Sequence, residues 1–170
     1  MSSSSSAPAE RPDHRTLNAP RRYVAALVAA AAVLACQPQD ETPGVWLRGE
    51  IASERVDDWR FTNDIEEIFV ETRSWYGIPH STTIWCVELS GELYIGSYGD
   101  QKKAWEKNLA RDPTAKLAIS GKLYEVTVAP VTEPGRIEAL DAAYAQKYDM
   151  AEVFGDAIPE WWYYQVVARS

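Results

Sequence analysis

The chain has 170 residues, enough for one domain with a substantial core and too few for two domains of usual size. Its formal net charge is −8, and residues 37–170 carry 13 basic and 23 acidic side chains. Because neutralising phosphates requires a basic face, this balance argues against nucleic acid as a partner. The two cysteines, Cys36 and Cys86, are too few for a disulfide framework, and the two histidines cannot supply a metal cluster.

The first 35 residues have the composition of an export signal. Arg21 and Arg22 precede an apolar run of mostly Ala, Val and Leu over residues 23–35. This run is shorter than the roughly 20 residues that span a bilayer as a helix, and it suits the hydrophobic region of a secretory signal. The paired arginines are also compatible with twin-arginine export.

The segment Val33-Leu34-Ala35-Cys36 resembles the lipobox of bacterial lipoproteins. The resemblance implies cleavage before Cys36 and acylation of that residue, with palmitate as a typical acyl group. We therefore expect a signal peptide over residues 1–35, a tether over residues 36–44 and one folded domain over residues 45–170. Such a protein would be exported and anchored through its N-terminal lipid to the cell membrane or outer membrane, facing the periplasm or the exterior. An uncleaved anchor, or an ordinary signal peptide with a chance cysteine, is the alternative.

Short runs rich in β-branched and aromatic residues dominate the rest of the chain. They predict strands at Val45–Ile51, Ile65–Arg73, Thr82–Leu89, Glu92–Ser97, Ala115–Ser120, Leu123–Val131 and Trp161–Ala168. In Ile65–Arg73, Ile68, Val70 and Thr72 share one face, while Phe69 lies on the other. The dipeptide Ser90-Gly91 predicts a tight turn that joins two of the strands into a hairpin.

Two stretches have helical spacing. The first, Asp100–Ala110, begins with Asp100 as its expected N-cap. The second follows Thr132 as its expected cap, with Pro134 in the first turn, and continues to Tyr148. Six or so strands with two inserted helices predict a β-rich α+β domain built as a closed or partly closed barrel.

Three segments resemble the split-barrel superfamily that includes pyridoxamine phosphate oxidases, and within it the branch of deazaflavin-dependent nitroreductase-like proteins and their uncharacterised relatives. They are residues 72–83, residues 92–99, and Trp105-Glu106-Lys107-Asn108-Leu109 followed by Asp112-Pro113. The last segment matches an aromatic-x-x-Asn-Leu helix and is the most specific of the three. The resemblance covers residues 62–169 and implies a six-stranded split β-barrel of the flavin-reductase type with two helices.

In that superfamily the loop before the second strand and the end of the third strand build the cofactor site. Carried over residue by residue, the resemblance implies cofactor-binding roles for Arg73, His80, Ser81, Thr82, Ser97, Tyr98, Gly99 and Trp105. The cofactor would be FMN or a deazaflavin, a small planar ligand that supports oxidoreduction. Deazaflavin binders carry Lys and Arg in this loop, whereas Arg73 is the only permanent cation of this one. The sequence therefore leaves open whether any cofactor is bound, and it assigns no catalytic side chain.

Each candidate also has a purely structural interpretation. Trp75, Tyr76 and the aromatic run at residues 161–164 could stack on a planar ring or belong to the core or a homodimer interface. His80 could donate a proton or be an ordinary turn residue, and Cys86 fits a small buried hydrophobe. Two functions remain open: a lipid-anchored barrel that binds a flavin or deazaflavin, and a non-enzymatic cell-envelope module that binds a small apolar ligand or a protein partner. A barrel kept only as a stable scaffold is a third interpretation.

Overall fold

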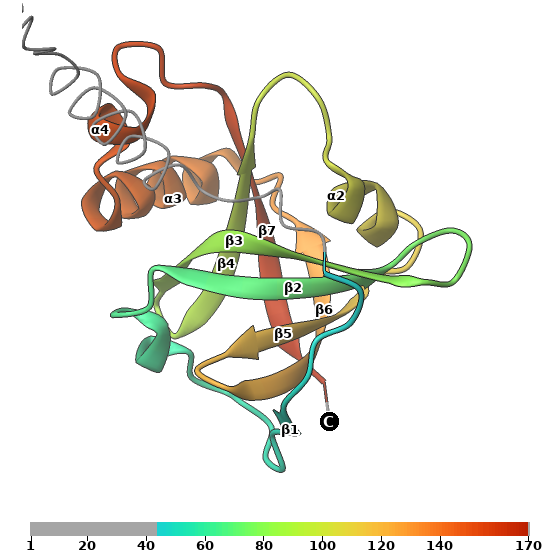
Figure 1. Ribbon diagram of the computed structural model, residues 1–170. Coiled ribbons are helices and arrows are strands. Elements are labelled where there is room, and N and C mark those ends of the chain that lie inside the picture. The colour runs from blue at the N-terminus through green and yellow to red at the C-terminus, as the bar shows by residue number, and fades with distance from the viewer. Residues whose placement is uncertain (1–43, 170) are drawn as a thin grey trace, which may run out of the picture. The chain divides into compact units, whose positions relative to one another are not determined.

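The computed structural model describes residues 44–169. The predicted signal peptide (1–35), the acylation site predicted at Cys36 and nearly all of the predicted tether lie outside these residues. The described part is a closed barrel of six antiparallel strands, joined by a short seventh strand and three α-helices (Figure 1). This architecture confirms the split barrel predicted from the sequence and adds one helix to the two that were expected.

The elements are β1 (Glu50–Ile51), the 3-10 helix η1 (Arg60–Thr62), β2 (Glu67–Arg73), β3 (Pro79–Leu89), β4 (Glu92–Tyr98), α2 (Ala104–Leu109), β5 (Thr114–Ile119), β6 (Lys122–Pro130), α3 (Pro134–Lys147), α4 (Met150–Phe154) and β7 (Trp161–Ala168). The strand order is β1-β6-β5-β2-β3-β4-β7, and β6 also pairs with β7, which closes the barrel. β1 lies parallel to β6 at the edge of the sheet, and the other pairs are antiparallel.

Strand β2 shows why the alternating pattern produces a barrel wall. Ile68 and Val70 are completely buried and Thr72 nearly so, whereas Phe69 keeps 48% of its surface exposed. Successive side chains of a strand point to opposite faces, so the three inward residues fill the barrel and the ring of Phe69 stays outside. The predicted faces of this strand are confirmed.

Strand β3 connects the two halves of the barrel. Its residues 79–85 pair with β2, and its residues 86–89 pair with β4. The hairpin turn after it is the predicted Ser90-Gly91, with φ of 59° and 85°. Positive φ at both central residues is the geometry of a type I′ turn, whose twist matches that of the two strands it joins.

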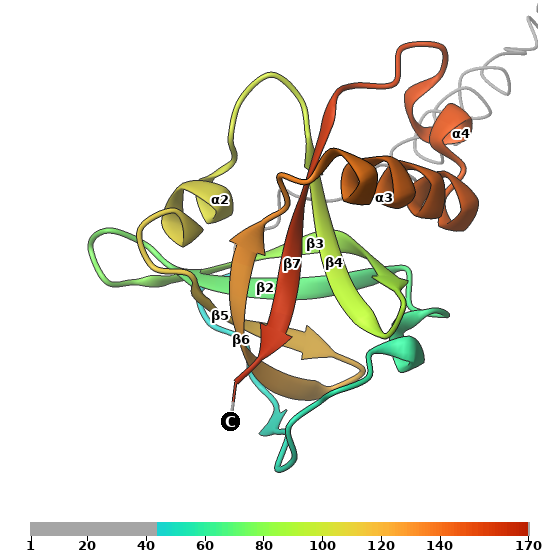
Figure 2. The ribbon, with the colours of Figure 1, turned by 180° about the vertical axis from the view of Figure 1, so that it is seen from behind.

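The buried side chains form two clusters. One fills the barrel, where Trp105 and Leu109 of α2 pack beside strand residues such as Ile68 and Leu117. The other lies beneath α3 and is largely aromatic: Trp85, Val87, Tyr94, Leu140, Tyr144, Tyr148 and Tyr163. Figure 2 shows α3 and α4 at one end of the barrel and α2 on the opposite side, next to the β2–β3 hairpin. No helix within residues 44–169 is long and apolar enough to cross a membrane.

Several predicted boundaries were wrong. The first strand is restricted to Glu50–Ile51, because the backbone of Gly44 pairs with Ser81 and the amide of Leu47 donates to the Glu71 carboxylate. The chain before β1 therefore contacts β3 and β2 and does not lengthen β1.

The predicted helix caps were also misplaced. Helix α2 begins after Lys103 and not after Asp100, because the Glu106 carboxylate accepts the Lys103 amide at 2.8 Å. Helix α3 is capped by Glu133 and not by Thr132. The short helix α4 was not predicted, since its five residues contribute no buried side chain and give no apolar stripe.

Candidate functional site

A groove of about 450 Å³ lies between the loop of the β2–β3 hairpin and helix α2. We call it the hairpin groove. Its lining combines aromatic, cationic and small polar side chains: Ser74, Trp75, Tyr76, His80, Ala104, Lys107, Asn108 and Arg111. Figures 1 and 2 both show α2 beside the hairpin loop, which extends beyond the barrel.

The hairpin loop is rigid at its base and presents two aromatic rings. The Ser74 hydroxyl donates to the carbonyl of Ile78 at 2.6 Å, and the Gly77 amide donates to the carbonyl of Ser74 at 2.9 Å. Gly77 has a φ of 86°, a conformation that glycine adopts without steric cost. Trp75 and Tyr76 are 78% and 59% exposed, with ring centroids 5.2 Å apart and perpendicular planes. Large aromatic surfaces left in water are unusual and mark a binding surface.

Helix α2 supplies the opposite wall of the groove. Asn108 is buried, and its side-chain amide donates to the Thr72 hydroxyl at 3.0 Å, which fixes the helix against β2. The same Asn108 accepts a hydrogen bond from the Arg111 guanidinium at 2.7 Å. Lys107 of α2 and Arg111, in the turn that follows the helix, are both exposed and line the same groove. The groove therefore has a positively charged wall.

His80 is half-buried between these walls. Its Nδ1 atom is shielded from solvent and has no hydrogen-bond partner among the described residues. Buried polar atoms are nearly always hydrogen-bonded in folded proteins, because desolvating one without a partner costs free energy. The imidazole of His80 therefore brings an unsatisfied nitrogen to the wall of the groove, and this nitrogen can act as donor or as acceptor if the ring turns toward a ligand.

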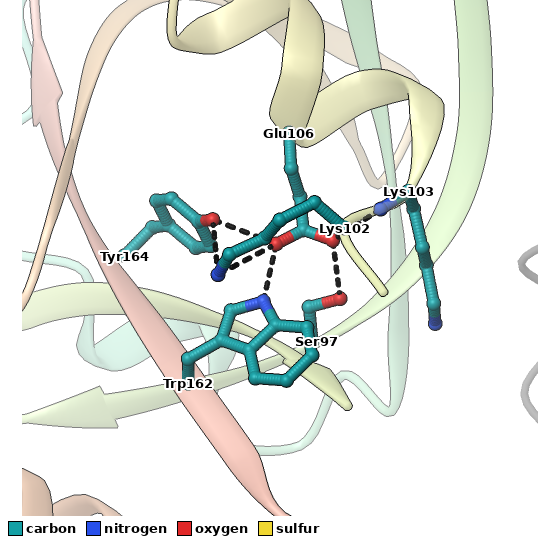
Figure 3. Close-up of polar contacts among 6 residues, drawn as sticks. All are labelled: Ser97, Lys102, Lys103, Glu106, Trp162 and Tyr164. Atoms are coloured by element: carbon teal, nitrogen blue, oxygen red, sulfur yellow. Dashed lines mark hydrogen bonds and ion pairs between the residues drawn. The ribbon is translucent and has the colours of Figure 1, made fainter. Parts of the chain in front are cut away.

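A buried carboxylate holds α2 in place (Figure 3). One oxygen of Glu106 accepts hydrogen bonds from Tyr164 (2.6 Å) and from the Trp162 indole, and it lies 3.3 Å from the Lys102 ammonium. The other oxygen accepts the Ser97 hydroxyl and the Lys103 amide, each at 2.8 Å. These contacts join α2, which carries Lys107 and precedes Arg111, to β4 and β7.

The donors around Glu106 determine its charge state. Burial by itself would raise the pKa of this carboxyl, but the hydrogen bonds from Tyr164, the Lys103 amide, Ser97 and Trp162 outweigh it and hold the pKa below its usual value. Glu106 is therefore ionised at neutral pH. Burial also lowers the pKa of the neighbouring Lys103 to about 8, against the opposing effect of the Glu106 charge.

The structure places the predicted residues Arg73 and His80 on opposite faces of the hairpin. His80 is paired with Thr72, and Arg73 with Pro79, so the alternation of each strand directs the two side chains apart. Arg73 lines a separate cavity of about 120 Å³ together with Lys116, Glu125 and Arg169, among others. Arg73 and His80 therefore cannot bind the same small group. Arg73 lines the smaller cavity, whereas His80 lines the hairpin groove.

The other predicted site residues do not line the hairpin groove. Thr82, Ser97 and Trp105 are almost fully buried, and the Ser97 hydroxyl is bonded to Glu106. Ser81 is buried beside Gly44, whose backbone it pairs with. The ring of Tyr98 packs beside α4 and β7, with its centroid 4.9 Å from that of Phe154 and 5.0 Å from that of Trp161. The Gly99 amide donates a hydrogen bond to the Glu160 carbonyl.

Reasoning from the sequence missed the two cations of the groove. Lys107 and Arg111 follow the hairpin by about 30 residues, and the sequence pattern gives no reason to place them against it. The available signal was their position in and directly after the aromatic-x-x-Asn-Leu segment. Cys86 is completely buried, as predicted, and burial raises the pKa of its thiol to about 11, although Lys147 opposes the shift. No cluster of metal-ligating side chains occurs within the part of the chain that the structure describes.

The barrel topology and the groove beside its hairpin define a split-barrel domain, the class predicted from the sequence. Residues 60–160 match the family described as an uncharacterized protein conserved in bacteria (DUF2255), and the chain belongs to this family. Comparison with curated proteins gave no match.

Solved structures share the fold at low sequence identity. The conserved hypothetical protein Rv2991 from Mycobacterium tuberculosis has a TM-score of 0.50 and 20% identity, over 70% of this chain and 87% of the other. A protein assigned to 5-nitroimidazole antibiotic resistance in Bacteroides thetaiotaomicron has a TM-score of 0.50 and 9% identity, over 76% and 89%. An F420-H2-dependent reductase has a TM-score of 0.42 and 14% identity, over 59% and 94%. At these identities the likeness concerns the fold alone.

Proposed function

We propose that the hairpin groove binds a planar cofactor with an anionic tail, FMN or a deazaflavin, and that the domain is an oxidoreductase. The observation that carries the proposal is the composition of the groove, in which two exposed aromatic rings, two cations and an unpaired imidazole nitrogen meet. Its volume of about 450 Å³ lies within the range of small-molecule and cofactor sites.

The residues of the groove fit the two ends of such a cofactor. Lys107 and Arg111 would hold the phosphate-bearing tail through charge-assisted hydrogen bonds. Trp75 or Tyr76 would cover one face of the ring, and His80 would meet a polar atom at its edge. When bound, a flavin or deazaflavin supplies hydride transfer, whereas the protein binds it, orients it and excludes water.

Titration of residues 37–170 with FMN and with a deazaflavin, followed by the fluorescence of the cofactor, tests the proposal. Replacing Lys107 or Arg111 by Gln should weaken binding about tenfold or more, because each removes a charge-assisted contact. Lys122→Gln, an exposed cation at the start of β6, serves as the matched control. Arg73→Gln tests the site predicted from the sequence. If Arg73→Gln lost cofactor binding and Lys107→Gln did not, the result would assign the cofactor to the smaller cavity that Arg73 lines.

A non-enzymatic envelope module is the second candidate. The exposure of Trp75 and Tyr76 favours it equally, since such rings also bind apolar ligands and proteins. A chain that takes up neither cofactor in the titration would support this candidate and overturn the first.

We also propose that Cys36 is acylated and moors the domain outside the cytoplasm. The support is the Leu-Ala-Cys sequence after the apolar run. Intact-mass measurement of the membrane-extracted protein should show a diacyl or triacyl mass on a chain starting at Cys36. The Cys36→Ser variant should keep its full N-terminus. An unmodified, uncleaved wild-type chain would refute the anchor. A homodimer remains a prediction.

A further inference from the structure

Five large apolar side chains are exposed on two neighbouring segments of the domain. They form what we call the apolar rim: Val45 (50% exposed), Trp46 (56%), Trp75 (78%), Tyr76 (59%) and Ile78 (53%). The rim comes from two segments, the chain before β1 and the loop of the β2–β3 hairpin. These segments are joined where Gly44 and Ser81 exchange backbone hydrogen bonds of 3.1 Å. Along the chain, Ile78 is three residues from that junction and Val45 is one.

The charges beside the hairpin part of the rim are positive, in contrast to the acidic domain, whereas the carboxylate next to Trp46, that of Glu71, is buried and accepts the Leu47 amide. No acidic residue occurs between Arg73 and Ser81. Exposed Lys107 and Arg111 lie across the hairpin groove from Trp75 and Tyr76, and the carboxylate of α2, Glu106, is buried and paired with the Lys102 ammonium at 3.3 Å. An apolar surface bordered by cations is therefore found on a domain with an excess of carboxylates.

We infer that the apolar rim docks on the surface of a lipid bilayer with anionic head groups. Tryptophan and tyrosine favour the membrane–water interface because their rings are apolar and carry one polar group. The neighbouring cations would face anionic head groups, to which Lys and Arg near a membrane are attracted.

The position of the predicted anchor agrees with this surface. Cys36 precedes Gly44 by eight residues, which span at most roughly 29 Å when extended. An acyl chain on Cys36 would thus keep the rim within reach of the bilayer. The inference does not rest on the proposed cofactor, because Val45, Trp46 and Ile78 do not line the hairpin groove.

Site-specific labelling of the full chain tests the docking. In the mature chain the sulfur of Cys36 would carry the acyl group and Cys86 is buried, so Ile78→Cys can be labelled selectively with an environment-sensitive fluorophore. Ile158→Cys is the matched control, because Ile158 is equally exposed (55%) but lies in the segment between α4 and β7. Both chains are reconstituted in vesicles of phosphatidylcholine, with or without phosphatidylglycerol.

We expect blue-shifted emission and several-fold stronger quenching by nitroxide-bearing lipid at position 78 than at position 158. The difference should be larger with phosphatidylglycerol and should decrease when salt is raised. Equal, water-like signals at the two positions would overturn the inference. A blue shift at position 78 that grows with the protein-to-lipid ratio, without quenching by the lipid, would instead assign the rim to a second copy of the chain and would also overturn it. Cofactor titration of the same labelled chains is expected to be unchanged, so failure of docking is distinguishable from failure of cofactor binding.

Discussion

Removing the buried carboxylate of Glu106 should destabilise the domain more than any other single change in a charged side chain of α2. In the Glu106→Ala variant, the Ser97 hydroxyl, the Trp162 indole and the Tyr164 hydroxyl lose their common acceptor. The amide of Lys103 loses its cap at the same time. These donors are largely buried, and water cannot replace the carboxylate for all of them.

The expected cost is about 3–5 kcal/mol in the free energy of unfolding, because several buried donors lose a charged acceptor and each unsatisfied donor costs about 1–3 kcal/mol. The Lys102 contact adds little to this figure, because its side chain is 49% exposed and the ion pair is screened. Glu106→Gln should cost less, about 2 kcal/mol, because one amide oxygen can still accept from Tyr164 and Trp162 while the NH₂ group faces the Lys103 amide.

The contribution of Glu106 also depends on pH with a defined sign. Its pKa in the folded protein lies below the ordinary value of 4.5, so folding favours the ionised form. The stabilisation is fully present above that ordinary value and is lost as the pH falls through the lower, folded pKa. The glutamine side chain does not ionise, so the stability difference between wild type and Glu106→Gln should shrink as the pH falls below about 4.5.

Urea unfolding of residues 37–170, followed by tryptophan fluorescence at pH 7 and at pH 4 and below, measures both effects. Glu138→Ala, an exposed carboxylate on α3, is the control and should change the stability by no more than about 0.5 kcal/mol. If Glu106→Ala were no more destabilising than this control, the carboxylate would not hold α2, and the reasoning would be refuted. A stability difference independent of pH would refute the ionised state.

Three further changes test the aromatic cluster and the core. Gly96→Ala should destabilise the domain by about 1–3 kcal/mol, because the added Cβ would lie 2.9 Å from atoms of the Trp161 and Tyr144 rings. Gly135→Ala, at the start of α3, is the control and should be neutral or stabilising. Equal melting temperatures of the two variants would contradict this prediction. Tyr148→Phe should lower the free energy of unfolding in urea by about 1–2 kcal/mol. The Tyr148 hydroxyl donates to the carbonyl of Glu66 at 2.6 Å and accepts from the amide of Cys86 at 3.1 Å, and both bonds would be lost. An unchanged unfolding midpoint would contradict these hydrogen bonds. The Cys86 thiol, with its pKa raised to about 11, should react with Ellman's reagent at pH 8 only after unfolding; rapid labelling of the native protein would show that it is accessible.

The strands and their faces could be predicted because they depend on neighbouring residues. In β2, the alternation of Ile68 and Val70 with Phe69 determines which side is buried, whatever the strand pairs with. The Ser90-Gly91 turn is equally local, since two consecutive positive φ angles favour residues of this kind. Closure through β6 and β7 is different, because it joins Val126 to Ala168 across more than 40 residues of chain.

The candidate site was predicted less well, for two physical reasons. Arg73 and His80 are close in sequence, but the register that pairs His80 with Thr72 puts them on opposite faces, and a shift of one residue would have reversed the outcome. Ser97 was expected to line the groove, whereas a buried carboxylate from α2 takes its hydroxyl. Local patterns do not contain either piece of information.

The sequence alone determined that this chain forms an antiparallel barrel with two principal helices, because hydrophobic periodicity and turn residues act over a few positions. Only the tertiary structure decided that Lys107 and Arg111 face Trp75 and His80 across one groove. The hydrogen bond from Asn108 to Thr72 and the donors gathered around Glu106 fix that side of the helix. The bonds from Asn108 to Thr72 and from Tyr164 to Glu106 link residues 36 and 58 positions apart, so they exist only once the barrel has closed.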